Sequence, residues 1–449
     1  MSILFLLPAF GSEQKRDSII VSLITCWPGP EVYELCGHEA VRVRSAEVPP
    51  VGLIASPRIY PQGQAPLDSV WNYGTFDFTE PNFVYRFVKG ETDYMLAGYP
   101  FRYFMPEYLA EGRRVVEQDL NLTQDEAWRL LGELREESRP ENCRYRYNYV
   151  KDNCATRIVG RLESAVGSRV IFPDTVKYGT FRREMRHYHR DYPWYQFGID
   201  LALGQGLDYD LTGREEMFVP LEMMEKAGGA HLEDGRPLVA ATRTLTEGVP
   251  DATLGPTHWS ATPLFCCSAF FVMVLLVCWL QARRRQIYRA VYSVWFLLLG
   301  LTGCVVAFLV FASSHEATSP NLLILWLNPL QLVAGVAVWF RRKGRWPVMV
   351  MMCYNVIVVG ILLLVWPFQH QSANPSFFPL MGATVALAAT YAIMRPRMSY
   401  NNNTHTYKSN TSTRDHEEVG NLGARRSGVT RRSGAGGSRP AKARGGNRR

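Results

Sequence analysis

Charged side chains are missing from five long apolar segments in the second half of the chain. None of these segments contains Asp, Glu, Lys or Arg, and they span residues 262–280, 291–312, 321–340, 347–366 and 377–394. A helix of about 20 such residues crosses a hydrocarbon core of roughly 30 Å, so we predict five membrane-spanning helices. Charged groups inside spans mark proton and ion pathways, and their absence argues against transport.

The nine cysteines include no C-x-x-C pair. A zinc site or a thioredoxin-like motif therefore has no support, and we expect neither a metal nor another cofactor. Four of the cysteines precede the apolar segments, and the other five lie within them. In an oxidising compartment Cys36 is able to pair with Cys26 or Cys143, which would leave Cys154 free. The spacing does not decide this pairing, and a disulfide of Cys154 stays open as the alternative to catalysis.

Basic residues are also absent from two of the four loops between the apolar segments. Residues 313–320 and 367–376 contain no Lys or Arg, whereas residues 281–290, residues 341–346 and the segment after 394 contain several. Lys and Arg are retained on the cytoplasmic side of a membrane. Residues 1–261 are therefore predicted to lie outside the cytoplasm, and the carboxyl-terminal tail inside.

The net charge of +8 belongs to that tail. Residues 395–449 hold 13 Lys and Arg against 3 Asp and Glu, a balance of +10, which leaves −2 for the rest of the chain. Because the tail has almost no large apolar residues, it is predicted to be disordered, and anionic inner-leaflet lipids are its expected partner. A single Arg-Gly-Gly stretch is weak evidence for RNA binding, so no nucleic acid is expected as a partner.

The amino terminus has little of what an export signal needs. Its apolar run, Ile3–Leu7, is short, and no basic residue precedes it. We interpret residues 1–16 as a weak signal segment. Either the signal is minimal, with cleavage near Gly11 and Ser12, or the true start lies upstream.

Residues 17–243 are predicted to form one domain with both strands and helices, and residues 244–261 its linker to the membrane. β-branched and aromatic residues predict strands at 19–26, 40–44, 70–78 and 113–120. Helices are expected at 123–139, at 154–166 and from 212 onward, the first of them beginning with a Thr123 to Glu126 capping box. His187 and His189 are interpreted as a solvated face.

Cys154 begins the second of these helices. A thiol at a helix start lies near unsatisfied backbone N–H groups and the positive end of the macrodipole, so its thiolate is predicted to be favoured. Asp152 or Asn153 is able to cap the helix. A histidine, His38, stands far upstream at the start of a strand, so the order of His and Cys is the reverse of that in papain-like enzymes. Geometry rather than sequence order defines such a site.

Three motifs carry a resemblance to a known family. They are Gly37-His38-Glu39-Ala40, Asn72-Tyr73-Gly74-Thr75-Phe76-Asp77-Phe78 and Asp152-Asn153-Cys154-Ala155-Thr156-Arg157. The order resembles that of lecithin:retinol acyltransferase and permuted NlpC-like thiol enzymes. The closer resemblance, over roughly residues 20 to 240 and again in the multi-span half, is to the Lnb-type bacterial lipoprotein intramolecular transacylases.

The resemblance implies a fold and a location. The fold would be an α+β permuted papain-like (NlpC-like) extracytoplasmic domain, followed by an all-α membrane domain of five transmembrane helices and a disordered tail. The location would be the bacterial inner membrane. The implied substrates are a membrane lipid and a lipoprotein.

The resemblance also implies an activity, the transfer of a fatty acyl chain from a lipid ester to the amino terminus of a lipoprotein. Cys154 would be the nucleophile and His38 its base, oriented by Tyr73 or Asn72. N–H groups at the helix start would hold the oxyanion. Further residues with expected roles are Asp152 and Asn153 at the helix start, Asp77 and Arg157 in support of the site, and His315 and Asn328 facing lipid.

Two other functions stay open. A thiol hydrolase of the cell envelope, either an amidase or a peptidase, would use the same Cys and His with water as the acceptor. A non-catalytic envelope scaffold would use neither residue. Product analysis separates the first from a transferase, and labelling of Cys154 with a thiol-directed probe would exclude the second.

Overall fold

A computed structural model describes residues 17–49, 66–77, 79–249, 256–340 and 345–395. By its contacts the chain forms one compact unit over Met1–Thr390 and a second over Tyr391–Arg449. The predicted signal segment, the basic loop residues 341–344 and all of the predicted tail except Arg395 lie outside the described residues. The fold described below therefore belongs almost entirely to the first unit.

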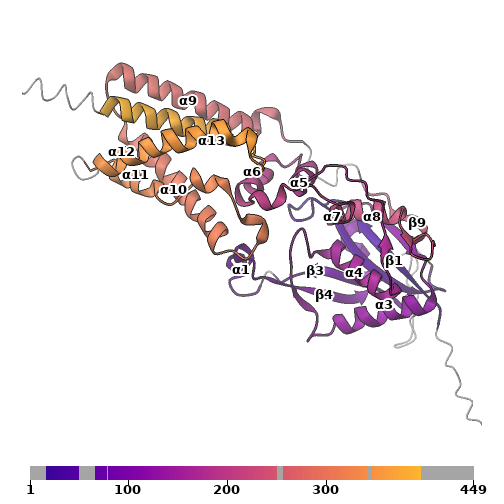
Figure 1. The fold of residues 1–449 in the computed structure, drawn as a ribbon. Helices are drawn as coiled ribbons and strands as arrows, with labels where there is room; N and C mark the ends of the chain where they lie inside the picture. Colours follow the sequence, from indigo (N-terminus) through magenta and orange to yellow (C-terminus); the bar gives the residue numbers. More distant parts are fainter. Residues whose placement is uncertain (1–16, 50–65, 78, 250–255, 341–344, 396–449) are drawn as a thin grey trace, which may run out of the picture. The chain divides into compact units, whose positions relative to one another are not determined.

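A seven-stranded antiparallel sheet forms the centre of the amino-terminal domain (Figure 1). Its spatial order is β6-β4-β3-β2-β1-β5-β9. Nearly every residue of β1 and β2 is buried, so both faces of the sheet are covered at its centre. The strands are β1 (Ile19–Cys26), β2 (His38–Ser45), β3 (Asp68–Thr75), β4 (Asp93–Pro100), β5 (Val115–Leu120), β6 (Arg144–Arg146) and β9 (Val239–Thr246).

The main hydrophobic core lies between one face of this sheet and three helices, α3 (Gln124–Glu137), α4 (Cys154–Val166) and α8 (Pro220–Gly228). The opposite face packs against η2 (Phe101–Tyr103) and α2 (Met105–Ala110). The expected capping box is present at α3, where Thr123 accepts from the Glu126 N–H. Its apolar face, Leu130, Leu131 and Leu134, is buried as the spacing predicts.

Smaller elements complete the domain. They are α1 (Phe83–Lys89), α5 (Phe181–Tyr188), α6 (Pro193–Ala202), η3 (Gln205–Leu207), α7 (Gly213–Glu216) and the pair β7 (Val170–Ile171) and β8 (His231–Leu232). Strands β4 and β9 were not expected from the sequence. Because β9 continues to Thr246, the first three residues of the predicted linker belong to the sheet.

The carboxyl-terminal half contains four helices long and apolar enough to cross a membrane, among the residues that the structure describes. They are α9 (Pro263–Arg284), α10 (Arg289–Phe311), the helix Trp346–Phe368 and the helix Phe377–Arg395. The third of these is composed of α12 (Arg345–Tyr354), the π-helical turn η7 (Asn355–Val359), α13 (Gly360–Val365) and η8 (Trp366–Phe368). The predicted count of five helices is not confirmed.

The segment that departs from the prediction is 321–340. It forms a short 3₁₀ helix, η6 (Leu322–Leu325), and then α11 (Gln331–Ala337), with Asn328 and Pro329 between them. Proline has no N–H to continue a helix, and the residue before it avoids the helical region. A reciprocal amide pair ties α11 to the π-helical turn: Gln331 Nε2 donates to Asn355 Oδ1 at 2.8 Å and Asn355 Nδ2 donates to Gln331 Oε1 at 3.1 Å.

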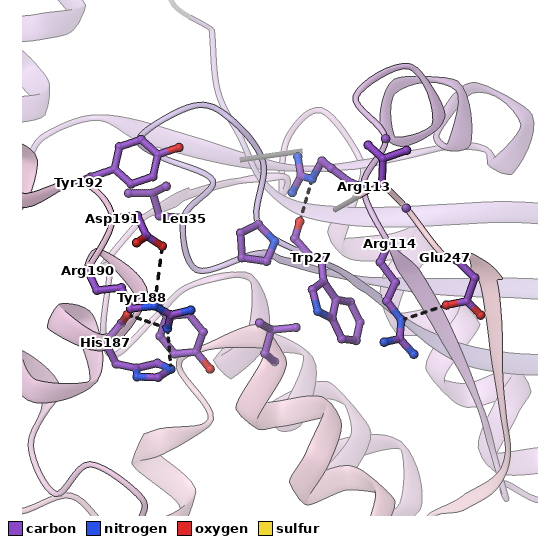
Figure 2. Close-up of a pocket in the computed structure, with 15 residues that line it drawn as sticks. Trp27, Leu35, Arg113, Arg114, His187, Tyr188, Arg190, Asp191, Tyr192 and Glu247 are labelled. Atoms are coloured by element: carbon purple, nitrogen blue, oxygen red, sulfur yellow. Dashed lines mark hydrogen bonds and ion pairs between the residues drawn. The ribbon is translucent and has the colours of Figure 1, made fainter. Parts of the chain in front are cut away.

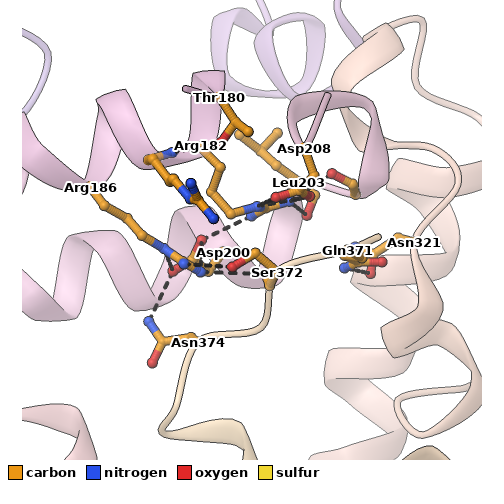
Figure 3. Close-up of polar contacts among 12 residues, drawn as sticks. Thr180, Arg182, Arg186, Asp200, Leu203, Asp208, Asn321, Gln371, Ser372 and Asn374 are labelled. Carbon is orange, nitrogen blue, oxygen red and sulfur yellow. Dashed lines mark hydrogen bonds and ion pairs between the residues drawn. The ribbon is translucent and has the colours of Figure 1, made fainter. Parts of the chain in front are cut away.

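Hydrogen bonds join two loops of the helical half to α5 and α6 (Figure 3). Asp200 is buried, and its carboxylate accepts from Arg182 Nη1 at 2.9 Å and from Asn374 Nδ2 at 3.0 Å. Arg186 Nη1 donates to Ser372 Oγ at 2.8 Å, and Asn321 Nδ2 donates to the Leu201 carbonyl at 3.1 Å. These contacts fasten the amino-terminal domain to one end of the apolar helices.

Candidate active site

Cys154 is the first residue of α4, as the sequence predicts. Of the two possible caps, Asn153 is the one in place: its Oδ1 accepts from the N–H groups of Ala155 and Thr156, each at 3.0 Å. Asn153 Nδ2 also donates to the carbonyls of Tyr149 and Phe218, so the buried amide is fully used. The helix start that carries the thiol is therefore fixed from both sides.

The Cys154 thiol lies where the ladder between β2 and β3 opens. The last paired residues are Val41 and Trp71, so residues 38–40 and 72–74 are not paired with each other. On one side of this opening, the backbone N–H of Glu39 interacts with the Cys154 sulfur as a hydrogen-bond donor. On the other side, a Cβ at Gly74 would lie 4.0 Å from Cys154 Cβ, and Gly74 has φ +87°, a conformation that favours glycine.

His38 is the first residue of β2 and is held by Asn72. Its Nε2 hydrogen-bonds Asn72 Oδ1, and Asn72 Nδ2 donates to Tyr99 Oη at 3.2 Å. Because the amide oxygen only accepts, Nε2 carries the imidazole proton, and Nδ1 keeps the lone pair needed by a base. Gly37 makes this position possible: its φ is +79°, and a Cβ there would lie 2.5 Å from the Cys26 carbonyl oxygen.

Cys154 reaches this opening from α4, and the hydrogen bond between His38 and Asn72 spans it from β2 to β3. The sulfur lies at the N–H of residue 39, directly after His38. A Cβ at Gly74, two residues after Asn72, would contact Cys154 Cβ. Within residues 17–49, 66–77 and 79–249, no hydrogen bond joins Cys154 to His38. The structure thus places the Cys154 sulfur against the backbone of the strand that carries His38, without a thiol–imidazole hydrogen bond.

Burial controls the charge of both groups. It raises the pKa of the Cys154 thiol to about 11, although the N–H groups of Glu39, Ala155 and Cys154 oppose the shift. Burial lowers the pKa of His38 to about 4, the Asn72 hydrogen bond opposing the shift and the Arg113 charge adding to it. The predicted preference for a thiolate is therefore wrong in direction, because desolvation outweighs the helix start. At neutral pH the site holds a neutral thiol and a neutral imidazole.

The other expected site residues lie on the helix side of the sheet or at its edge. Tyr73 Oη donates to Glu137 at 2.6 Å and does not contact His38, because neighbours on a strand point to opposite faces. Arg157 binds Asp152 through two bonds of 2.7 and 2.9 Å and Glu137 at 3.0 Å. Asp77 is exposed and accepts from Thr79, which is a turn interaction.

The two residues expected to face lipid have protein partners. His315 Nε2 lies 2.9 Å from the Phe87 carbonyl oxygen, next to α1. Asn328 is buried, and its backbone packs so closely on Gly303 that a Cβ there would approach it within 2.5 Å. Asn328 thus belongs to a tight crossing between α10 and the broken segment, and the expectation of a lipid-facing side chain is wrong for it.

Two features of the site were not anticipated. Glu39 is buried beside the thiol, accepts from Thr25 Oγ1 at 2.8 Å, and has a pKa raised well above its usual value by burial. His189 is wholly buried rather than solvated, with Nδ1 2.8 Å from Gln196 Oε1 and Nε2 4.0 Å from Cys36 Sγ. Alternation along β2 would have placed Glu39 on the core face, whereas nothing local marks His189 as buried. All nine cysteine thiols, including those of Cys36 and Cys154, are free in the structure.

A pocket of about 560 Å³ opens beside the ends of β1 and β5 (Figure 2). Trp27, Arg114 and Arg190 line it together with Asp191 and Glu247, so its charge is mixed. Neither Cys154 nor His38 lines it. Nearby, Glu34, Glu107 and Glu111 place carboxylate oxygens within 4.8 Å of one another, but Arg113 Nη1 already binds Glu34 and Glu111. Because Arg113 already balances part of this negative charge, the cluster does not require a bound cation.

The fold and the site define a membrane protein with an α/β domain that holds a buried thiol at a helix start. Residues 11–182 match the family model of the Lnb N-terminal periplasmic domain, and residues 256–397 match that of the Lnb transmembrane domain. The chain belongs to the Lnb family and is a membrane lipoprotein-processing protein with an extracytoplasmic amino-terminal domain. No curated protein and no solved structure matches it.

Proposed function

We propose that this protein is a membrane-bound thiol acyltransferase that moves a fatty acyl chain from a lipid ester to the amino terminus of a lipoprotein. The observation that carries the proposal is the position of the Cys154 sulfur, at a capped helix start and against the N–H of the residue after His38. Membership of the Lnb family supports the substrate class.

The first half of the reaction forms a thioester. His38 Nδ1 takes the Cys154 proton as the sulfur attacks the ester carbonyl carbon, and the same proton then passes to the departing alcohol oxygen of the lyso-lipid. The oxyanion is held by backbone N–H groups. Asn153 Oδ1 accepts from the N–H groups of Ala155 and Thr156, so the N–H groups of Cys154 and Glu39 are the donors left for it.

The second half transfers the chain to an amine. The α-amino group of the lipoprotein attacks the thioester carbonyl, His38 takes a proton from the nitrogen, and Cys154 leaves and regains its proton. An amide bond replaces the thioester. Cys154 and His38 are both neutral at the start. His38 is therefore able to accept a proton in each half of the reaction, and no thiolate–imidazolium pair has to form beforehand.

The proposal extends to fold and topology. The outer domain would be a permuted papain-like (NlpC-like) fold, with the His strand before the Cys helix. Residues 321–340 would cross the bacterial inner membrane as a broken fifth pass, which the alternating loop charges require if the basic tail is cytoplasmic and meets anionic lipid. Broken segments are tolerated at membrane depth where protein partners satisfy the backbone, and Gln331 and Asn355 are such partners.

The test is mass spectrometry of lipoprotein amino termini in cells that carry Cys154→Ser. N-acylation is expected to fall at least about a hundredfold, since the covalent step is lost, with the same amount of protein in the membrane. Cys143→Ser is the matched control, because Cys143 is a thiol of the same domain whose Sγ donates to the Pro140 carbonyl at 3.7 Å.

Full N-acylation by the Cys154→Ser protein would reject the proposal. If the wild-type protein instead released free fatty acid or peptide in a Cys154-dependent manner, with no N-acylated lipoprotein, the activity would be that of a hydrolase.

A further inference from the structure

Helix α1 is apolar and none of its residues is buried. The sequence Phe-Val-Tyr-Arg-Phe-Val-Lys has five apolar residues in seven, yet Val84, Tyr85 and Phe87 are 72%, 55% and 49% exposed. Exposed apolar patches of this kind mark contact with a partner or a membrane. An ordinary surface helix buries one apolar stripe, whereas in α1 even Phe83, which stacks on Phe76, is only half-buried.

The position of α1 indicates what covers it. The Tyr85 ring lies 6.1 Å from the ring of Phe308, which is three residues, or about 4.5 Å, from the end of the span α10. Ser313 Oγ donates to the Val88 carbonyl at 2.9 Å, and His315 binds the Phe87 carbonyl. A helix fixed to the outer end of a membrane span lies at the level of the lipid surface.

A row of aromatic rings runs from α1 to the nucleophile. Phe87 stacks on Phe83 with ring centroids 6.2 Å apart, and Phe83 stacks on Phe76 at 5.7 Å. The row continues from Phe76 to Tyr94 at 5.1 Å and from Tyr94 to Tyr147 at 4.2 Å.

Gly74 separates the end of this row from the thiol. A Cβ there would lie 3.5 Å from Tyr147 Cε2 and 4.0 Å from Cys154 Cβ, so glycine leaves this space without a side chain. The row therefore extends from α1, beside the end of α10, to the neighbourhood of Cys154 through aromatic side chains of one domain.

We propose that α1 inserts into the outer leaflet and that this aromatic row, Phe87, Phe83, Phe76, Tyr94 and Tyr147, holds the acyl chain of the donor lipid on its way to Cys154. The inference rests on the proposed function for its last step. It adds the element through which the lipid enters and the residues that hold the chain. Ring faces suit an acyl chain because they offer apolar contact, and the hydroxyl groups of Tyr94 and Tyr147 lie at the ring edges.

Photocrosslinking tests the route without relying on turnover. The full-length protein is placed in phosphatidylethanolamine nanodiscs that contain a trace of the same lipid with a diazirine at the end of one acyl chain, and labelled residues are mapped by mass spectrometry. We expect label in α1 and at Phe76 and Tyr94 as well as in the spans. Tyr103, which is 64% exposed and lies on the other side of the sheet, serves as the internal control. Labelling confined to residues 263–395 overturns the proposal.

A charge in α1 should interrupt the route. Val84→Asp is expected to lower labelling of Phe76 and turnover of the membrane lipid by about tenfold, which corresponds to about 1.4 kcal/mol. Leu109→Asp in α2, at a residue that is 45% exposed, is the matched control and should change neither. Turnover of a water-soluble short-chain ester should stay unchanged in both variants.

The two substrates separate this inference from the proposed function. Equal loss on the membrane lipid and the soluble ester in Val84→Asp would overturn the route, because it would indicate damage to the site itself. Absence of turnover of either ester by the wild-type protein would reject the proposed function, and the crosslinks would still decide whether lipid occupies the row.

Discussion

The imidazole of His38 is oriented by an amide, and that choice could not be read from the sequence. Asn72 and Tyr73 are adjacent in β3, so one of them must point to each face of the sheet. Only the register with β2 decides which of the two meets His38. The structure gives Asn72 that role and binds Tyr73 Oη to Glu137.

Asn72→Ala should therefore reduce activity by roughly 10- to 100-fold, because the imidazole loses the partner that fixes its tautomer. Tyr73→Phe should leave activity within about threefold while lowering the free energy of unfolding by about 1–3 kcal/mol, the range for a lost hydrogen bond to a charged group. Transfer assays and thermal unfolding of both variants give the comparison. The reverse ranking of activities would assign the orienting role to Tyr73.

The protonation state of Cys154 is a second property of single residues that spacing could not reveal. Motif and helix start were visible in the sequence, but the degree of burial was not, and burial decides the sign of the pKa shift. A pKa of about 11 means that the thiolate fraction increases about tenfold per pH unit throughout the range below it.

The rate of Cys154 alkylation by iodoacetamide should therefore rise about tenfold per unit between pH 7 and 9.5 without levelling off. The unfolded protein, with an ordinary thiol pKa near 9.0, should begin to level off within that range. Activity should be retained down to about pH 5, since His38, with a pKa of about 4, gains its proton only below that. A plateau of the alkylation rate that begins below pH 7 would instead indicate a thiolate–imidazolium pair.

At the scale of elements, the start of α4 combines structural and functional roles. Asn153 caps the helix and also holds the carbonyls of Tyr149 and Phe218, whereas the Thr123 capping box of α3 lies at a helix start with no part in the site. The two caps thus form a natural comparison between a helix start that carries the thiol and one that does not.

Asn153→Ala and Thr123→Ala should each lower the free energy of unfolding by about 1–2 kcal/mol, the usual cost of a lost cap. Only Asn153→Ala should also lower transfer activity, by about tenfold or more, because the N–H groups that face the substrate carbonyl shift with the helix start. Chemical unfolding and transfer assays on the same preparations test this. Equal activities in the two variants would show that the cap has no bearing on the site.

Elements were predictable where one local pattern dominated. Strand β1 and helices α3 and α4 follow from β-branched content, a capping box and apolar spacing. One continuous helix was predicted for segment 321–340 because its composition is that of a membrane-spanning helix. The structure has two short helices there, because Pro329 interrupts the helical backbone. Strand β9 was missed because it lies at the edge of the sheet, where none of its eight residues is buried.

At the scale of the whole molecule, the charge of the loops carries topological information that no single helix holds. The junction between the two halves is different, because its residues are separated by up to 228 positions and share no motif. Asp200 is its centre. Arg182, Arg186 and Asn374 all approach this one buried carboxylate (Figure 3). Long-range pairs of this kind are invisible in a single sequence.

Asn374→Asp tests the junction with little change of shape. The new carboxylate would still accept from the Ser376 N–H, as Asn374 Oδ1 does at 3.0 Å, but it would face Asp200 where an N–H group now donates. Two buried carboxylates at hydrogen-bond distance should lower the thermal unfolding midpoint and cost about 2–4 kcal/mol.

The double variant Asp200→Asn with Asn374→Asp is the matched control. It restores one donor and one acceptor across the junction and keeps a negative charge near Arg186, so it should recover at least half of the lost stability. Independent, additive losses in the double variant would mean that the two side chains do not interact, and the junction would then depend on the backbone contacts of Gly204 and Gln205 with residues 317 and 320.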